Sequence, residues 1–388
     1  MSWESLDAEI RDWRARQLWR DLRVVESRAA GALRLEGGDC ISFASNDYLG
    51  LASSSWLQEQ LAQAVSQHGA GAAASRLICG HHRAHARLEE KLADFKQTEA
   101  ALSFISGHAT ATGVIPALVG QGDTVIVDRL AHACLLDGVR LSGATLRVFA
   151  HQDLDRLEFA LSKARGRVLI VTESVFSMDG DLAPLKQIVE LKNRYGAWLL
   201  LDEAHAVGVL GPQGRGLAAA CGLADQVELH MGTLGKAFGL SGGYLAASRR
   251  VVDWLINRAR SLVFSTAPVP ALAEAAGRVV DFMLTEPAEE LRSRLAEHMK
   301  LLGRLSQTAM ASAILPWMVG DEGQAVALSQ SLIRQGWWVP AVRYPTVGKG
   351  KARLRISLNA AHRACDLEGL VAAMHSLATN RPDLGPPD

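Results

Sequence analysis

Short apolar runs alternate with amphipathic segments through the middle of the chain. The runs cover residues 101–104, 124–127, 145–149, 167–172, 198–201, 227–231 and 244–247. Each has the length of a buried strand, and helical patterns or loops separate most of them. Strands that alternate with helices are typical of a parallel sheet with crossover connections. The pattern therefore predicts an α/β domain around a mainly parallel central sheet.

The two ends of the chain have different patterns. Residues 1–25 show amphipathic helical spacing, and a short strand pattern follows at 41–43. Helical spacing also marks 55–67, 84–96 and, after Pro268 and Pro270, the long stretch 271–305. Beyond it, strand patterns at 313–319, 338–342 and 353–358 alternate with helical ones at 323–335 and 365–376. We predict an N-terminal helical arm (1–45), a large α/β domain (46–275) and a small C-terminal α+β domain (276–388) with a frayed end at 382–388.

Composition narrows the class of protein. The 388 residues are 48% hydrophobic and 21% charged with zero formal net charge, which is typical of a soluble globular enzyme. A neutral chain gives no electrostatic reason to expect binding to nucleic acid or to an anionic membrane. No apolar stretch reaches the ~18 residues of a membrane-spanning helix, and we expect no signal peptide. The five cysteines are scattered without a C-x-x-C pair, so we expect reduced thiols and a cytoplasmic location.

One lysine stands in a glycine-flanked loop directly after a predicted strand. Lys236 lies between Gly235 and Gly239, which let the backbone approach a bound molecule closely. Lysine forms Schiff bases with carbonyl groups, and a solvated surface lysine is the plain alternative. A phosphate-binding P-loop would require Gly-x-x-x-x-Gly-Lys-Ser/Thr. That interpretation fails because His230 replaces the first glycine and Ala237 follows the lysine.

A second motif places a carboxylate at the end of a predicted buried strand. Four apolar residues (198–201) precede Asp202, and Glu-Ala-His follows it. Ligands of open α/β sheets bind beyond the carboxyl ends of strands, so Asp202 is placed to meet a cation. That cation is magnesium in the Asp-Glu-Ala-His box of nucleotide-driven helicases, or a protonated pyridine nitrogen in a pyridoxal phosphate (PLP) site. Without a phosphate-binding lysine motif the helicase interpretation is remote, and a capping role for Asp202 is the structural alternative.

Several segments, in order along the chain, resemble those of the α-oxoamine synthases, a subgroup of the fold-type I PLP enzymes. They are 45–50, 106–107, 128–133, 172–181, 202–205 and 233–236, and the resemblance extends from about Arg20 to about His362. It implies a large domain with a mainly parallel sheet, a smaller C-terminal domain, PLP as cofactor and a homodimer with shared active sites. Enzymes of this family join an amino acid to an acyl thioester and release carbon dioxide.

The resemblance also implies roles for individual residues. Lys236 matches the Schiff-base lysine that removes the substrate α-proton, and Asp202 matches the partner of the pyridine nitrogen. His132 matches the histidine that stacks on the pyridine ring and contacts the substrate. The other matching cofactor-binding positions are Ser177, His205, Gly107, His108 and Thr233. His108 replaces an aromatic residue common in the family, so only its backbone is expected to bind the phosphate.

Substrate-binding positions are implied near both ends of the chain. Asn46 and Arg355 match positions that bind the amino-acid carboxylate, which a planar guanidinium holds with two hydrogen bonds, and Arg343 is a second candidate. Arg20 and Thr346 match positions near the acyl thioester. The order of the two arginines stays open at this stage.

Two further clusters allow alternative interpretations. Ser265 and Thr266 either reach the phosphate of a second subunit or form a plain turn before a proline. His81, His82 and His85 have helical spacing that could suit a metal, but no carboxylate or cysteine completes such a site. We therefore interpret the histidines as a helix start with packing contacts and expect no metal.

Among the reactions of the family, the condensation of L-alanine with a pimeloyl thioester fits best. It yields 8-amino-7-oxononanoate, carbon dioxide and a free thiol in biotin synthesis. The fit rests on the segments 74–77, 342–347 and 352–355. Members that use glycine with acetyl or succinyl thioesters are the alternative, and the acyl carrier is either coenzyme A or a carrier protein.

Overall fold

The computed structural model describes residues 3–16 and 18–379, which fold into two compact units. The larger unit is Asn46–Ala296. The smaller unit joins the described residues before Asn46 to those from Glu297 onward. The end predicted to be frayed, 382–388, lies outside the described residues.

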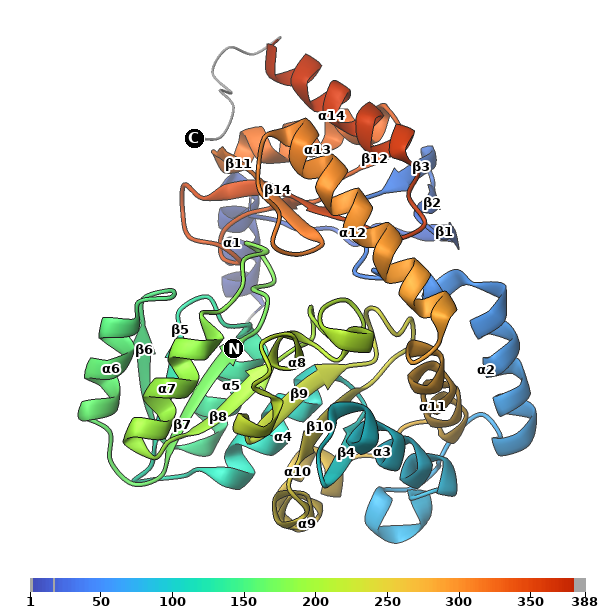
Figure 1. Ribbon diagram of the computed structural model, residues 1–388. Coiled ribbons are helices and arrows are strands. Elements are labelled where there is room, and N and C mark those ends of the chain that lie inside the picture. Colours follow the sequence, from blue (N-terminus) through green and yellow to red (C-terminus); the bar gives the residue numbers. More distant parts are fainter. Residues whose placement is uncertain (1–2, 17, 380–388) are drawn as a thin grey trace. The chain divides into compact units, whose positions relative to one another are not determined.

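The larger unit is built on a seven-stranded sheet with the strand order β4-β10-β9-β8-β7-β5-β6 (Figure 1). The strands are β4 (Ala100–Phe104), β5 (Thr124–Asp128), β6 (Thr145–Phe149), β7 (Val168–Glu173), β8 (Trp198–Asp202), β9 (Leu229–Thr233) and β10 (Gly243–Ala247). β10 is antiparallel to both of its neighbours, and all other neighbours are parallel. The sheet confirms the predicted α/β class, and each predicted strand of this region is present.

Helices lie before, between and after these strands in the chain. They are α2 (Ser55–His68), α3 (Arg83–Lys96), α4 (Gly107–Leu118), α5 (Ala133–Ser142), α6 (Leu154–Ser162), α7 (Leu185–Tyr195), α8 (Leu217–Ala220), α9 (Arg249–Arg258), α10 (Arg260–Val263) and α11 (Pro270–Met283). Helix α12 (Glu286–Ser306) starts in the larger unit and continues into the smaller one. Every residue of β4, β5 and β10 is buried, so this sheet needs cover on both faces.

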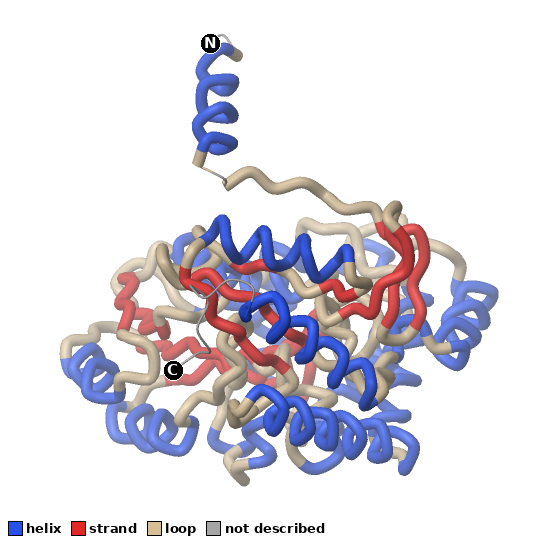
Figure 2. The backbone as a smooth tube through the Cα atoms, turned by 90° about the horizontal axis from the view of Figure 1, so that it is seen from above, coloured by secondary structure: helices blue, strands red, loops and turns tan. Residues whose placement is uncertain are grey.

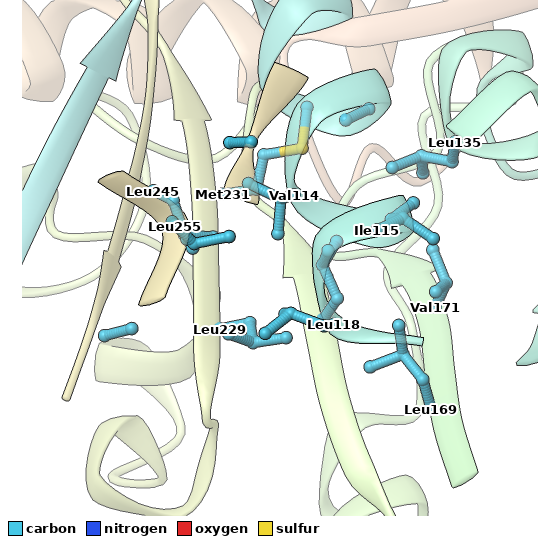
Figure 3. Close-up of a cluster of buried hydrophobic side chains, with 14 of the residues drawn as sticks. Val114, Ile115, Leu118, Leu135, Leu169, Val171, Leu229, Met231, Leu245 and Leu255 are labelled. Atoms are coloured by element: carbon cyan, nitrogen blue, oxygen red, sulfur yellow. The ribbon is translucent and has the colours of Figure 1, made fainter. Parts of the chain in front are cut away.

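One hydrophobic core lies between a face of this sheet and the helices α4, α5 and α9 (Figure 3). Alternate residues along the strands point into it, as the two-residue period of a strand requires. Its labelled members are Val114, Ile115, Leu118, Leu135, Leu169, Val171, Leu229, Met231, Leu245 and Leu255. Gly138 of α5 brings the two helices close, because a Cβ there would lie 2.7 Å from the Ala111 carbonyl oxygen. This packing fixes the beginnings of α4 and α5 relative to the strands.

The boundary between the two units differs from the predicted one at residue 276. That position lies inside α11, where Ala276, Val279 and Val280 are buried. α11 packs against α2 and α3, so it belongs to the larger unit. Pro270 starts α11, as proline often does in the first turn of a helix, and does not mark the end of a domain. The predicted helix 271–305 is in fact two helices, and Pro287 lies in the first turn of the second.

The smaller unit contains two small sheets. One has the order β1-β2-β3-β12 and the other β11-β14-β13. The strands are β1 (Val25–Ala29), β2 (Ala32–Leu35), β3 (Gly38–Ser42), β11 (Ile314–Gly320), β12 (Trp337–Trp338), β13 (Ala341–Val342) and β14 (Ala352–Ser357), with helices α13 (Glu322–Arg334) and α14 (Ala364–Thr379). These elements agree with the α+β pattern expected for the C-terminal part.

The N-terminal segment differs from the predicted helical arm. Helix α1 (Glu4–Ala15) ends well before residue 25 and buries none of its residues. Residues 18–24 form neither helix nor strand and lead to β1 (Figure 2). β3 pairs in parallel with β12, which joins the start of the chain to its C-terminal part. The described part of 1–45 therefore belongs to the smaller unit and is mostly strand and loop. In the described chain, no helix combines the length and the apolar character needed to cross a membrane.

Candidate active site

Side chains from neighbouring strands meet at the carboxyl-terminal edge of the central sheet. β7 ends at Glu173, β8 at Asp202 and β9 at Thr233, and these strands are adjacent and parallel. Glu173 and Asp202 are paired in register. The antiparallel β10 begins at the same edge with Gly243, the register partner of Thr233. Ligands of open α/β sheets bind beyond this edge.

A chain of hydrogen bonds leads from Lys236 into the protein interior. Lys236 Nζ lies 2.9 Å from His205 Nε2, and His205 Nδ1 lies 2.5 Å from the Tyr48 hydroxyl. An ammonium group only donates, so Nε2 accepts from Lys236 and Nδ1–H donates to the Tyr48 oxygen. The Tyr48 hydroxyl then donates to Asn46 Oδ1 at 3.4 Å. This order of donors makes His205 a neutral imidazole that orients the lysine.

The loop that carries Lys236 is held by a tight turn. Gly239 has a φ of 70°, and a Cβ there would lie 2.6 Å from the Ala52 amide nitrogen, so only glycine fits. The Gly239 amide donates to the Lys236 carbonyl at 2.8 Å, and the Leu240 amide donates to the Leu234 carbonyl at 2.9 Å. These bonds fix the half-buried lysine next to His205.

Asp202 and Glu173 are buried carboxyl groups in different electrostatic surroundings. Only 5% of Asp202 and 2% of Glu173 is exposed to solvent. Burial raises the pKa of Asp202, but the Lys236 charge and the Ala204 amide, which donates to Oδ1 at 2.9 Å, favour its ionised form. Burial and the Asp202 charge together raise the pKa of Glu173 to about 8. Of this pair, Asp202 is therefore the carboxyl group whose ionised form the Lys236 charge and the Ala204 amide favour, and Glu173 is the one whose neutral form burial and the Asp202 charge favour.

His132 stands at the start of α5, where it caps the helix. Its Nδ1 accepts a hydrogen bond from the Cys134 amide at 3.2 Å, so the proton of the neutral ring is on Nε2. Burial lowers the pKa of His132. The negative charge of Asp202 opposes that shift but does not reverse it. An uncharged imidazole ring suits stacking on another aromatic ring.

The start of α4 offers backbone donors at the same edge. Ser106 caps this helix by accepting from the Ala109 amide at 3.0 Å. The N–H groups of Gly107 and His108 belong to the first turn, where an α-helix supplies no carbonyl partner, and such a helix start binds anions. A Cβ on Gly243 would lie 2.7 Å from the Gly107 nitrogen, so glycine in β10 allows this helix start to approach the strand.

Thr233 lies next to this helix start, and Asp137 lies next to the side chain of His108. A Cβ on Gly107 would lie 4.0 Å from Thr233 Cβ, which places the end of β9 beside it. The Thr233 hydroxyl donates to the Gly242 carbonyl at 2.9 Å and accepts from the Gly235 amide at 3.1 Å. The exposed side chain of His108 lies 3.6 Å from Asp137. The side chain of His108 therefore points toward Asp137, and only its backbone N–H is available to bind an anion at the helix start.

Four of the predicted substrate-binding residues lie in the smaller unit. Arg20 donates to the Thr346 hydroxyl at 3.1 Å, which brings together the pair assigned to the acyl thioester. Arg343 donates to the Trp19 carbonyl at 2.6 Å. Arg355 is 5% exposed within β14 and donates to the Ser357 hydroxyl at 2.6 Å. That Arg355, ahead of Arg343, binds the substrate carboxylate stays a prediction.

The two ambiguous clusters have defined structural contacts. Thr266 pairs with Ser75 in an isolated bridge, and the Ser265 hydroxyl donates to the Thr266 carbonyl at 3.2 Å. His82 caps α3. His85 is fully buried and contacts the Pro268 carbonyl oxygen at 2.9 Å, and burial lowers its pKa to about 4. The histidines thus have the packing contacts expected of a helix start.

Sequence reasoning gave no role to two residues at this edge. Tyr48 lies within the motif 45–50, but its contact with His205 depends on residues far apart in the chain. Glu173 ends the strand β7 just as Asp202 ends β8, so the rule that selected Asp202 applies equally to Glu173. That rule, applied to every predicted strand, would have found it.

Comparisons with known proteins identify the family of the chain. The sequence model of the family described as aminotransferase class I and II matches residues 38–374. The 8-amino-7-oxononanoate synthase of Geobacter sulfurreducens is 46% identical over 378 residues, which cover 95% of this chain and 97% of that protein. The enzyme of the same name from Aromatoleum aromaticum is 44% identical and covers 97% of this chain and 99% of its own.

A solved structure shows the same fold. The backbone of a serine palmitoyltransferase variant from S. paucimobilis, with PLP and myriocin bound, superimposes with a TM-score of 0.91. It is 28% identical, and the match covers 97% of this chain and 98% of that one.

Proposed function

This chain belongs to the aminotransferase class I and II family, and we propose that it is a PLP-dependent acyltransferase acting in biotin biosynthesis. The reaction joins L-alanine to a pimeloyl thioester and yields 8-amino-7-oxononanoate, carbon dioxide and a free thiol. The thioester is carried by coenzyme A or by a carrier protein. The placement of Lys236 beside His205, at the same sheet edge as Asp202, carries the proposal.

The residues at the sheet edge fit PLP group by group. Lys236 provides an amine, and the buried Asp202 provides a carboxylate that the Lys236 charge favours. His132 offers a neutral ring, and His205 with Ser177 offers polar groups. The phosphate would be held at the start of α4 by Gly107 and His108, with Thr233 beside them. When bound, PLP supplies an electron sink for the carbanion at the alanine Cα.

Lys236 is the residue we assign to proton transfer at the alanine Cα. It takes the α-proton and later returns a proton to the product carbon, as a general base and acid. A lysine does so only as a neutral amine, and it donates to His205 Nε2 when charged. His205 in turn is held by Tyr48, so this hydrogen-bond chain aims the amine and limits its rotation.

Asp202 and His132 would both hold the ring of the cofactor. Asp202 holds a negative charge in a site with little water, where its interaction with a protonated nitrogen is strong. Its charge would keep that nitrogen protonated. His132 would orient the ring by stacking, and its cap on α5 fixes the imidazole. We assign the substrate carboxylate to Asn46 and Arg355, with Arg343 as the second candidate, and the acyl thioester to Arg20 and Thr346.

The choice between the two arginines can be tested by a matched pair of variants. Arg355→Ala is expected to weaken alanine binding by about 2–5 kcal/mol, because a buried charge partner is lost. Binding of the pimeloyl thioester should change much less. Arg343→Ala, measured by the same titration, is the control for loss of one positive charge. Abolished alanine binding in Arg343→Ala with normal binding in Arg355→Ala would reverse the order.

A homodimer and a cytoplasmic location also belong to the proposal. The segment Arg76–Gly80 contacts α10, and three apolar side chains there are exposed: Leu77 by 51%, Ile78 by 80% and Phe264 by 71%. A cluster of this kind on a globular protein supports contact with another chain, and we assign a second copy. All five cysteines are free thiols, which supports a reducing compartment.

The substrate assignment predicts a specific ranking of activities. Alanine, glycine and serine are combined with acetyl, succinyl, pimeloyl and palmitoyl thioesters, and release of carbon dioxide and thiol is followed. We expect the highest kcat/KM for alanine with the pimeloyl thioester, and complementation of a biotin-requiring strain that lacks this step. One methyl group changes binding by only about 1–3 kcal/mol, so glycine should be a weak alternative substrate. Much faster turnover of glycine with the acetyl or succinyl thioester would overturn the substrate but not the family.

A further inference from the structure

Glu173 connects two backbone segments that carry proposed cofactor-binding residues. Its Oε2 accepts a hydrogen bond from the Ser177 amide at 3.1 Å, in the loop after β7. The backbone of His132, at the start of α5, also lies close enough to this carboxyl group to favour its ionised form. These two segments are far apart in sequence, and Glu173 joins them one strand away from Asp202. Neither the cofactor nor a substrate is assigned to Glu173.

The other carboxyl oxygen of Glu173 has no contact that would stabilise a negative charge. Oε1 is buried without a hydrogen-bond partner among the described residues. Three titratable groups face the carboxyl: Asp202 on β8, Lys236 in the loop after β9, and Cys134 in the first turn of α5. Within the described chain Glu173 forms no ion pair, and the Lys236 amine contacts His205. A second buried negative charge next to Asp202 would be costly, and the neutral acid avoids that cost.

Glu203, the residue after Asp202, shows the opposite arrangement. It is also fully buried, but the Lys96 ammonium lies 2.5 Å away and the Ala218 amide donates to it at 3.1 Å. Burial alone would raise the pKa of Glu203. The Lys96 charge outweighs that effect, and the pKa is lowered to about 2. The two buried glutamates therefore differ in their partners: Lys96 neutralises the charge of Glu203, whereas Glu173 forms no ion pair within the described chain.

We propose that Glu173 is a positioning residue that works as a neutral carboxylic acid. It holds the backbones of His132 and Ser177 at the sheet edge and leaves Asp202 as the single negative charge of the pair. The positioning role rests on the proposed function, whereas the location of the proton does not. Raised from an ordinary value of 4.5 to about 8, the pKa of Glu173 agrees with a proton held in the folded protein.

The pH dependence of stability tests where the proton is. A group with a raised folded pKa contributes stability that is fully present below its unfolded pKa and is lost as pH rises through its folded pKa. For Glu173 this window runs from 4.5 to about 8. Glu173→Gln keeps the shape and has no proton to lose. As the pH rises from about 6 to about 9, the wild type should lose this contribution to its stability and the variant should not. The thermal midpoint of the cofactor-free variant should therefore rise by several degrees relative to that of the cofactor-free wild type.

Glu203→Gln is the matched control. A group with a lowered folded pKa contributes stability that is present above its unfolded pKa and is lost as pH falls. For Glu203 this window, from 4.5 down to about 2, lies below the tested range. The variant should therefore be less stable than the wild type by a constant amount from about pH 6 to about pH 9. If Glu173→Gln shows the same constant loss, the proton is not on Glu173 and the proposal fails.

The positioning role is tested on the PLP-loaded enzyme with two variants. Glu173→Gln retains an acceptor oxygen and should lower kcat only a few-fold, with the visible absorbance of bound PLP unchanged. Glu173→Ala removes both backbone contacts and should lower kcat on the order of 100-fold, with a shifted absorbance band. If Gln is as harmful as Ala at neutral pH, the anion is required and the proposal is wrong. If the wild type does not convert alanine and the pimeloyl thioester, the proposed function fails, while the stability result still locates the proton.

Discussion

Lys236→Ala is expected to remove the ability of the protein to exchange the alanine α-proton. Loss of a general base alone typically lowers the rate about 10²- to 10⁴-fold, and the link between protein and cofactor is lost as well. NMR of alanine in deuterated solvent measures the exchange directly. Borohydride reduction and peptide mapping should place a pyridoxyl group on Lys236 of the wild type and nowhere on the variant.

The exposed Lys186 of α7 provides a matched control. Lys186→Ala removes a solvent-exposed amine of the same kind, one to which no role at the site is assigned, and should exchange alanine as fast as the wild type. Exchange at the wild-type rate in Lys236→Ala would exclude Lys236 as the base. A colourless wild-type protein that hydrolyses ATP with nucleic-acid stimulation would revive the remote helicase interpretation.

Asp202→Asn should retain PLP but lose most of the proton exchange. Asn keeps the size of the side chain and an oxygen that can accept from the Ala204 amide. It removes the charge that we propose keeps the ring nitrogen protonated, and the loss of one such electrostatic contact costs about 10²- to 10³-fold. The exchange of the alanine α-proton, measured with PLP occupancy checked by absorbance, gives the size of the effect.

A carboxylate at the opposite edge of the same sheet serves as the control for Asp202. Glu228 lies just before β9, where it accepts from the Leu199 amide at 2.8 Å and contacts Lys192 at 2.6 Å. Glu228→Gln should reduce stability and leave exchange nearly unchanged. If Asp202→Asn also leaves exchange unchanged, the carboxylate has only a structural role.

The central sheet could be predicted from sequence because most of its strands are buried on both faces, the edge strand β6 excepted. Such strands are continuous apolar runs, and those at 124–127 and 198–201 need no tertiary information to be recognised. β1 was missed for the opposite reason, since all of its residues are exposed and its sequence has no apolar alternation. The break between α11 and α12 was missed because helical spacing continues across it, although Pro287 gives a local signal.

The site was predictable where chemistry and local pattern coincide. Lys236 and Asp202 each combine a reactive side chain with a strand end, and the structure brings both to one edge of the sheet. Tyr48 and Glu173 matter through contacts with residues that are distant in the chain. Arg355 and Arg343 are the same residue type in neighbouring strand patterns, so no local rule separates them.

The position of β10 has a consequence for how the protein folds. β10 lies between β4 and β9, although the whole of β5 to β8 separates β4 from β9 in the chain. Pairing of β4 must therefore wait until residues 243–247 have been synthesised, which makes this a contact of high sequence separation and slow formation. Gly243 pairs with both Phe104 and Thr233, so the step that closes the sheet also assembles the helix start beside the lysine loop. A nascent chain therefore cannot bring the start of α4 beside the end of β9 before β10 is inserted between β4 and β9.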